Sequence, residues 1–339
     1  MRPTRATLAV VTSAALLASA AGCDSATTED TTAATILIAA DLELTGSSAS
    51  VGNAYRQALE LKRDQLNAEA GPNGLRIELD IKDNRSDRKL SAQNIAQFAN
   101  NSSVAALITG ACAECVIDSL DTIKQRKLPT ISLSPSSDVV TPLDESRQFV
   151  FKLASNPLDN ASALMSEMEI AGIDRFALIS TQDAYGKNAR DAIVDEAGAA
   201  NIRLVTDKQI APGDAKVDTT VSQALAVNSP KALVVAALPD RAQEVVASAR
   251  NTGFKGQIFL DAAAAGDLFL SSESAGANEK ATLIFSQTLS IDGVIANTPV
   301  KALRKAWAAE YTSRFGTYYG PSSFAADAMQ IIVNSVARA

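Results

Sequence analysis

The chain of 339 residues is 47% hydrophobic and 20% charged, which is enough apolar material to bury the cores of two ordinary domains. Its formal net charge of −7 argues against a nucleic-acid partner, because phosphate backbones are bound by basic surfaces. The sequence contains no histidine, which excludes Ser-His-Asp and Cys-His catalysis and histidine metal ligands. A carboxylate pair or a Ser-Lys arrangement stays open, but we expect no enzyme activity, no cofactor and no metal.

Residues 1–22 have the pattern of a secretory signal peptide, with two arginines before an uncharged apolar run, Ala6–Gly22. The end of this run, Ala20–Cys23, resembles the lipobox of bacterial lipoproteins, which implies cleavage before Cys23 and a lipid on its sulfur. The alternatives are cleavage after an Ala-x-Ala site, an uncleaved anchor and a buried segment. The polar residues 23–34 are predicted to be a flexible tether, so we expect a protein outside the cytoplasm that is lipid-anchored to the cell membrane.

From Thr35 onward, β-branched runs alternate with helical stretches in two series. The first series has predicted strands at Thr35–Asp41, Arg76–Asp83, Val104–Thr109 and Pro129–Ser134 and helices at Val51–Ala70 and Ala92–Asn100. The second has strands at Arg175–Thr181, Ile202–Gln209, Ala232–Ala237 and Gln257–Asp261 and helices at Asn188–Ala200 and Arg241–Thr252. This alternation predicts an α/β fold of two similar lobes, each a parallel sheet with crossover helices on both faces.

Extended runs at Gln148–Leu153 and Ala281–Leu289 are predicted to cross between the lobes. Asn156-Pro157, after the first run, is a helix-start signal. Two strongly helical segments follow the second run, at Val300–Phe315 and Ser323–Arg338, and are predicted to return to the first lobe. The predicted boundaries are 35–150 plus 290–339 for the first lobe and 151–289 for the second.

Ligands of open parallel sheets bind beyond the carboxyl ends of the strands. The loops after the strands of two facing lobes are therefore predicted to line one cleft. These loops are Glu43–Gly52, Gly110–Cys115, Ser134–Asp138, Gln182–Lys187, Leu238–Asp240 and Asp261–Gly266. Cys112 and Leu238, which lie in two of them, are counted among the predicted ligand contacts.

Cys112 and Cys115 are three residues apart. Outside the cytoplasm such a pair can close a small disulfide, and two buried thiols or a redox pair are the alternatives. A metal site would need two more ligands, and neither a second cysteine pair nor a histidine supplies them.

Several stretches together resemble the extracellular solute-binding proteins of branched-chain amino-acid ABC transporters. They are LELTGSSASVGNAYRQALELKRDQLNAEAGPNGLRIELDIKDN, ISLSPSSDVVT, FALISTQDAYGKNARDAI and VSQALAVNSPKALVVAALPDRAQEVVASARNTGFKGQIF. The resemblance covers roughly Ile36–Arg338 and rests on the order and spacing of the motifs. It implies the type I periplasmic-binding-protein fold, two Rossmann-like lobes joined by three hinge crossovers. Members of that family usually continue past the position of Ala339 with a third crossing into the second lobe.

The resemblance also implies which first-lobe residues hold the ligand. Val51 stands where relatives often carry an aromatic residue, and Glu114 stands where they usually carry a small hydroxyl residue. The alternative for Glu114 is a helix cap. Ser136 and Ser137 match positions that present hydroxyls and backbone N–H groups to a carboxylate. Asp138 follows them and is expected to receive a cation or to end a turn.

In the second lobe, Tyr185 matches a tyrosine that closes over the ligand, with a core tyrosine as the alternative. Asp261 is the acid nearest to the position that pairs with a ligand ammonium. Together these residues predict that the cleft holds a small polar solute.

We therefore expect a monomeric, lipid-anchored receptor that captures a small solute by hinge closure and delivers it to an ABC permease. Amino acids are the first ligand class, followed by amides, urea-like solutes and small organic acids. A ligand-sensing lipoprotein of the same fold and a carboxylate-based hydrolase are the alternatives. Without histidine, affinity is expected to be nearly flat between about pH 6 and 8, because no unperturbed side chain titrates there.

Overall fold

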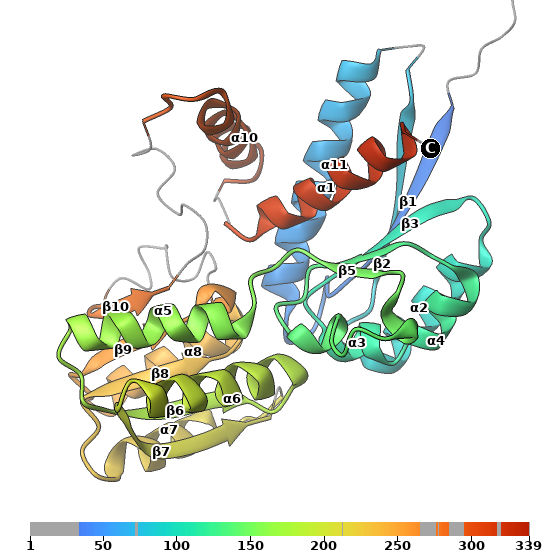
Figure 1. The fold of residues 1–339 in the computed structure, drawn as a ribbon. Coiled ribbons are helices and arrows are strands. Elements are labelled where there is room, and N and C mark those ends of the chain that lie inside the picture. The colour runs from blue at the N-terminus through green and yellow to red at the C-terminus, as the bar shows by residue number, and fades with distance from the viewer. Residues whose placement is uncertain are drawn as a thin grey trace, which may run out of the picture. The chain divides into compact units, whose positions relative to one another are not determined.

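The structure, a computed structural model, describes residues 34–71, 74–211, 213–264, 276, 278–284, 295–316 and 320–338. It contains two parallel five-stranded sheets, which we call the sheets of the first and second lobe (Figure 1). The predicted α/β class with two parallel-sheet lobes is confirmed. The predictions for residues 1–22, for the tether and for Cys23 fall outside the described residues, as do parts of 261–266 and 281–289.

The first-lobe sheet has the order β2-β1-β3-β4-β5. Its strands are β1 (Thr35–Leu42), β2 (Arg76–Asp83), β3 (Val104–Thr109), β4 (Thr130–Ser132) and β5 (Val150–Lys152). The helices between them are α1 (Ala49–Ala70), α2 (Arg88–Asn100), α3 (Ala113–Ile117) and α4 (Leu120–Arg126). One apolar cluster joins the sheet to α1, and another joins it to α2, α3 and α4, so both faces of the sheet are covered.

The second-lobe sheet has the order β10-β9-β8-β6-β7. Its strands are β6 (Arg175–Thr181), β7 (Arg203–Ile210), β8 (Ala232–Ala236), β9 (Gln257–Leu260) and β10 (Ala281–Leu283). The helices are α5 (Pro157–Ile170), α6 (Ala184–Ala199), α7 (Val217–Ala226) and α8 (Pro239–Asn251). Helices α5 and α6 cover one face of this sheet, and α7 and α8 cover the other.

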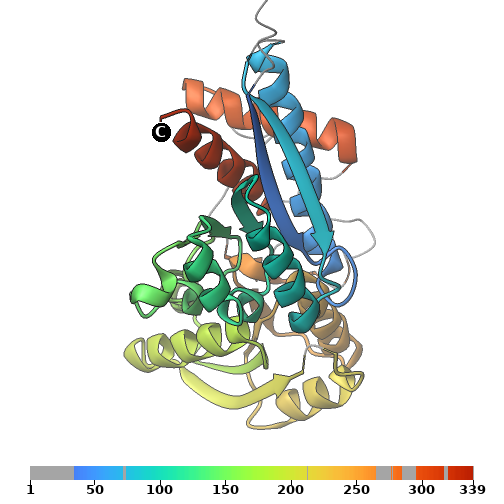
Figure 2. The same cartoon turned by 90° about the vertical axis from the view of Figure 1, so that its right-hand side faces the viewer.

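The last two helices, α10 (Pro299–Phe315) and α11 (Ser322–Val336), pack on α1 of the first lobe. The Tyr311 hydroxyl on α10 donates to the Ala54 carbonyl over 3.3 Å, and Met329 on α11 is fully buried in the α1 cluster. In Figure 2, α10 (orange) and α11 (dark red) lie beside α1 (light blue). No helix within the described residues is long and apolar enough to span a membrane.

All six predicted helices begin one to four residues before their predicted starts, and capping explains the two largest differences. Helix α2 begins at Arg88 because the Asp87 carboxylate accepts the Leu90 N–H over 2.8 Å. Helix α6 begins at Ala184 because the Asp183 carboxylate accepts the Gly186 N–H over 2.7 Å. An N-cap satisfies backbone donors in the first turn, and apolar periodicity does not report it. The periodicity also missed α3, α4 and α7, which are short or weakly patterned.

Candidate functional site

The carboxyl ends of strands from both sheets meet around one narrow pocket, which is partly open to solvent and has a cavity volume of about 20 Å³, enough for about one water molecule. Nine of the eleven described residues that line it are apolar. The first-lobe and crossover side consists of Val51, Tyr55, Leu133, Pro135, Ala154, Ser155, Pro321 and Phe324, and the second-lobe side of Leu238, Ala262 and Ala263. Two residues predicted as ligand contacts, Val51 and Leu238, therefore lie on opposite sides of the pocket.

The predicted residues Ser136, Ser137 and Asp138 contact the second lobe through one side chain, Asn188 of α6. The Asn188 Oδ1 atom accepts the Ser136 hydroxyl over 2.5 Å and the Ser137 N–H over 3.1 Å. The Asn188 Nδ2 group donates to the Asp138 carboxylate over 3.1 Å. The carboxamide thus occupies both donors that were predicted to bind a carboxylate. The sequence analysis did not single out Asn188, because a polar residue on a helix gives no signal of its partner.

Two further hydrogen bonds join the lobes beside this contact. The Glu114 carboxylate accepts the Ala184 N–H over 2.6 Å, at the first turn of α6. A carboxylate is stabilised at a helix N-terminus, so Glu114 caps a helix, as the alternative interpretation proposed, but the helix belongs to the other lobe. The Ser50 hydroxyl donates to the Asp240 carboxylate of α8 over 2.8 Å.

The remaining predicted residues, Tyr185 and Asp261, contact each other inside the second lobe. The Tyr185 hydroxyl donates to the Asp261 carboxylate, and both residues are 2% exposed. Burial raises the pKa of Asp261 to about 6, while the Tyr185 and Ala263 donors oppose that rise. Neither side chain lines the pocket, although Ala262 and Ala263, the next residues in the chain, do. Their role as ligand contacts stays a prediction.

The sequence analysis missed a buried acidic group in the first lobe. Glu43, directly after β1, is 1% exposed and accepts the N–H groups of Ala111 and Cys112, each over 3.1 Å. Burial is the main cause that raises the pKa of Glu43 to about 6, and the nearby Asp41 charge adds to it. The sequence feature that could have indicated this buried acid is the pair of acids at the end of an apolar strand, in Ala-Asp-Leu-Glu. The expected flat pH profile assumed unperturbed side chains, and Glu43 and Asp261 depart from that assumption.

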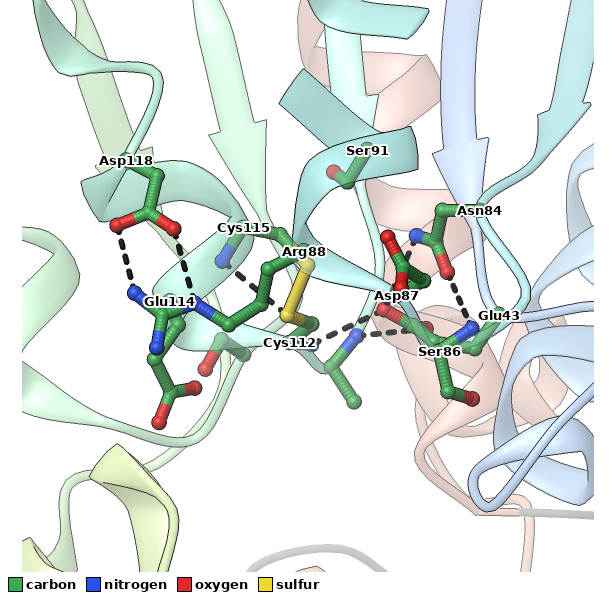
Figure 3. Close-up of a disulfide and its surroundings, with 12 residues drawn as sticks. Glu43, Asn84, Ser86, Asp87, Arg88, Ser91, Cys112, Glu114, Cys115 and Asp118 are labelled. Atoms are coloured by element: carbon green, nitrogen blue, oxygen red, sulfur yellow. Dashed lines mark hydrogen bonds and ion pairs between the residues drawn. A yellow bond between two sulfur atoms is a disulfide. The ribbon is translucent and has the colours of Figure 1, made fainter. Parts of the chain in front are cut away.

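Cys112 and Cys115 form a disulfide at the start of α3, where Cys112 is partly buried and Cys115 is 1% exposed (Figure 3). The Cys115 N–H donates to the Cys112 sulfur over 3.1 Å. Glu43 lies beside the pair, with its carboxylate and the two sulfurs all within 4.8 Å of one another. These three are the one cluster of metal-ligating residue types in the part of the chain that the structure describes. Since the sulfurs are bonded to each other, they offer no thiolate to a metal.

Replacing Asn188 with Ala should shift the protein away from the arrangement in which the lobes touch. The change removes the three hydrogen bonds to Ser136, Ser137 and Asp138, which together stabilise that arrangement by about 1 to 2 kcal/mol, or about tenfold in its population. Small-angle X-ray scattering should then give a larger radius of gyration. Lys187→Ala, which removes only a pair with Asp191 on the same helix, should leave the scattering unchanged. Equal scattering from both variants would contradict the role of Asn188.

Two parallel-sheet lobes with a shared apolar pocket at their strand ends define a two-lobed binding protein. The chain belongs to the periplasmic binding protein family, whose model matches residues 35–339. The members of this family are extracytoplasmic receptors for solutes. The predicted resemblance to solute-binding proteins of the type I fold is therefore confirmed.

Solved structures show the same fold at low sequence identity. An extracellular ligand-binding receptor from Rhodopseudomonas palustris is 22% identical with a TM-score of 0.77, and the match covers 88% of this chain and 81% of that one. The substrate-binding protein of a branched-chain amino acid transporter from Streptococcus pneumoniae, solved with isoleucine, is 21% identical with a TM-score of 0.76, covering 88% and 83%. A leucine-binding protein from Thermotoga maritima is 18% identical with a TM-score of 0.75, covering 89% and 83%. A search of curated protein sequences finds no match.

Proposed function

We propose that the protein captures a small solute between its two lobes and delivers it to an ABC permease. The observation that carries this proposal is the pocket lined from both sides, with Val51 and Phe324 facing Leu238 and Ala263. A solute that touches both sides binds the touching arrangement more tightly than an open one, and it therefore shifts the population toward closure. The permease would then recognise the closed form. A lipid on Cys23 would hold this monomeric receptor at the outer face of the membrane.

The chain crosses between the lobes directly beside the pocket. Lys152, the last residue of β5, donates to the carbonyl oxygens of Ala154 and Ser155 and to the Asn156 side chain. Burial lowers the pKa of Lys152 to about 8, so the ammonium remains charged at neutral pH. Ala154 and Ser155 also line the pocket. The first crossover is therefore a braced segment that contacts the solute, which suits a hinge whose position depends on the solute.

The lining favours a solute with an aliphatic part. Hydroxyls at Tyr55 and Ser155 are the only polar side chains among the described lining residues, so apolar burial is the main source of affinity. We propose small amino acids with aliphatic side chains and their amides as the first ligand class. The isoleucine bound by the Streptococcus pneumoniae protein supports this choice by analogy of fold.

Filling the pocket tests the proposal. A panel of amino acids, amides and small organic acids in a thermal-shift assay should identify a solute that stabilises the protein. Calorimetry should then give its affinity, and the solute should be recovered from the protein chemically unchanged. Leu238→Trp should weaken binding of that solute at least about tenfold, because the larger ring enters space the solute needs. The matched control is Leu143→Trp, at a side chain that is 91% exposed, and it should bind normally. Equal affinity in both variants, or chemical turnover of the solute, would overturn the proposal.

A further inference from the structure

The Cys112–Cys115 disulfide has three features that a purely structural crosslink does not need. One sulfur belongs to the partly buried Cys112 and the other to the fully buried Cys115. The Cys112 sulfur already accepts the Cys115 N–H over 3.1 Å, a contact that also stabilises a thiolate. The buried Glu43 carboxylate, which can hold or release a proton, lies within 4.8 Å of both sulfurs. A partly buried cysteine, an N–H donor to its sulfur and a buried acid are groups that thiol–disulfide exchange uses.

From this geometry we infer that Cys112 and Cys115 form a thiol–disulfide exchange site for small thiols, with Glu43 as its proton donor and acceptor. This reaction is chemically distinct from solute capture. Glu43 is held in place for this role by the Ala111 and Cys112 N–H groups. It is also enclosed by Gly110, where a Cβ atom would lie 2.1 Å from the Glu43 Oε2 atom.

The exchange balances as follows. A small thiolate RS⁻ attacks the Cys112 sulfur, the Cys112–Cys115 bond breaks, and RS–S–Cys112 forms. The departing Cys115 thiolate takes the proton of the neutral Glu43 carboxyl, which becomes a carboxylate. A second thiolate attacks the R sulfur and releases RSSR and the Cys112 thiolate. The two protons that the small thiols lost on ionisation return through water to the Cys112 thiolate and the Glu43 carboxylate. Two thiols are thereby oxidised to one disulfide, and the protein disulfide is reduced to two thiols.

The protonation of Glu43 suits both directions of this reaction. Burial raises the pKa of Glu43 to about 6, so both protonation states are populated near neutral pH. In the reverse direction the carboxylate takes the Cys115 proton, and the thiolate that results attacks the mixed disulfide on Cys112.

The surroundings select a small thiol over a protein thiol. Glu114 lies between the two cysteines, and its carboxylate contacts Ala184 of the second lobe over 2.6 Å. Figure 3 shows Glu43 and Glu114 on different sides of the disulfide. The second lobe restricts the approach of a bulky protein substrate on the Glu114 side, so an aminothiol or a small thiol peptide is the favoured substrate class.

The test uses the full chain with Cys23→Ser, so that only two cysteines react. Reduced glutathione is the probe, and acid quenching, alkylation and mass spectrometry follow the loss of the disulfide while circular dichroism monitors the fold. We expect the folded protein to be reduced by millimolar glutathione, with an inflection in the rate near pH 6. Glu43→Gln should slow the reduction at least about tenfold and remove the inflection. Glu60→Gln, the same change on the surface of α1, should do neither.

Two single-cysteine variants test the proposed exchange site even if Glu43→Gln does not fold. With oxidised glutathione, Cys115→Ser should give a mixed disulfide at Cys112, whereas Cys112→Ser should leave the buried Cys115 unmodified. The inference is overturned if the disulfide is reduced only when the protein unfolds. It is equally overturned if Glu43→Gln keeps the rate and pH profile of the parent, or if the two single-cysteine variants react alike.

Discussion

Gly186→Ala should lower the free energy of unfolding by about 3 kcal/mol, whereas Gly198→Ala in the same helix should raise it by about 0.5 to 1 kcal/mol. A Cβ atom at Gly186 would lie 2.1 Å from the Thr181 carbonyl oxygen, so the start of α6 would have to move away from the end of β6. At Gly198 nothing lies within 4 Å of the added atom, and Ala gains only its helix propensity. Urea denaturation of the two variants and the parent measures both changes.

The opposite signs make the comparison its own control, because both substitutions add one methyl group to α6. Gly52 offers an independent check in the first lobe, since a Cβ atom there would lie 2.1 Å from the Glu43 carbonyl oxygen. A destabilisation of less than 1 kcal/mol at both Gly186 and Gly52 would show that these helix starts can move without cost.

Stability should fall as the pH rises from about 4.5 to 7.5, by about 1.5 to 2 kcal/mol for each of Glu43 and Asp261. The pKa of each carboxyl is raised to about 6, from ordinary values of 4.5 for Glu43 and 3.8 for Asp261. Between the unfolded and folded pKa values the native state holds more protons than the unfolded state. The stabilisation is therefore complete below about pH 4 and is lost as the pH rises through about 6. Urea denaturation at a series of pH values measures the slope.

The variant Glu43→Gln/Asp261→Asn should remove the contribution of these two groups to the slope, because neither amide titrates. Partial burial would raise the pKa values of Asp64 and Asp83, but hydrogen bonds to their carboxylates lower them overall. The titration of these two groups therefore makes stability rise with pH. They lose stabilisation only under more acidic conditions, whereas burial also raises the pKa values of Asp41, Asp183, Asp240 and Asp327, which add to the slope. Stability that rises between about pH 5 and 7.5 in the parent protein would contradict the expected titration.

Strands such as β3 and β6 could be predicted because their apolar runs are continuous, and the edge strand β2 could be predicted from its alternation of apolar and polar residues. For Arg76–Asp83, Val104–Thr109 and Arg175–Thr181 the predicted and observed bounds are identical. Parallel strands buried on both faces produce such runs whatever their neighbours are. Helix starts were less predictable, since the start of α6 depends on where the Asp183 side chain points.

Individual contacts in the site were harder to predict, because a contact depends on two residues and a single sequence shows only one at a time. The predicted order of strands and loops places Val51 and Leu238 at one cleft, and both residues line the pocket in the structure. It did not pair Ser136 with Asn188, which is 52 residues away, or Glu114 with Ala184, which is 70 residues away. Glu43 was overlooked for a related reason, because its burial depends on two glycines elsewhere in the chain. Gly52 leaves space for the Glu43 backbone, and Gly110 leaves space for its carboxylate.

The position of Glu114 links two equilibria that would otherwise be independent. It lies in the short loop closed by the two cysteines, and the same side chain contacts the first turn of α6 in the other lobe. By thermodynamic reciprocity, if an intact crosslink favours contact between the lobes by some factor, then that contact protects the crosslink from reduction by the same factor. A solute that draws the lobes together would in that case shield the sulfur bond, and its occupancy could be read from the redox state of the cysteines.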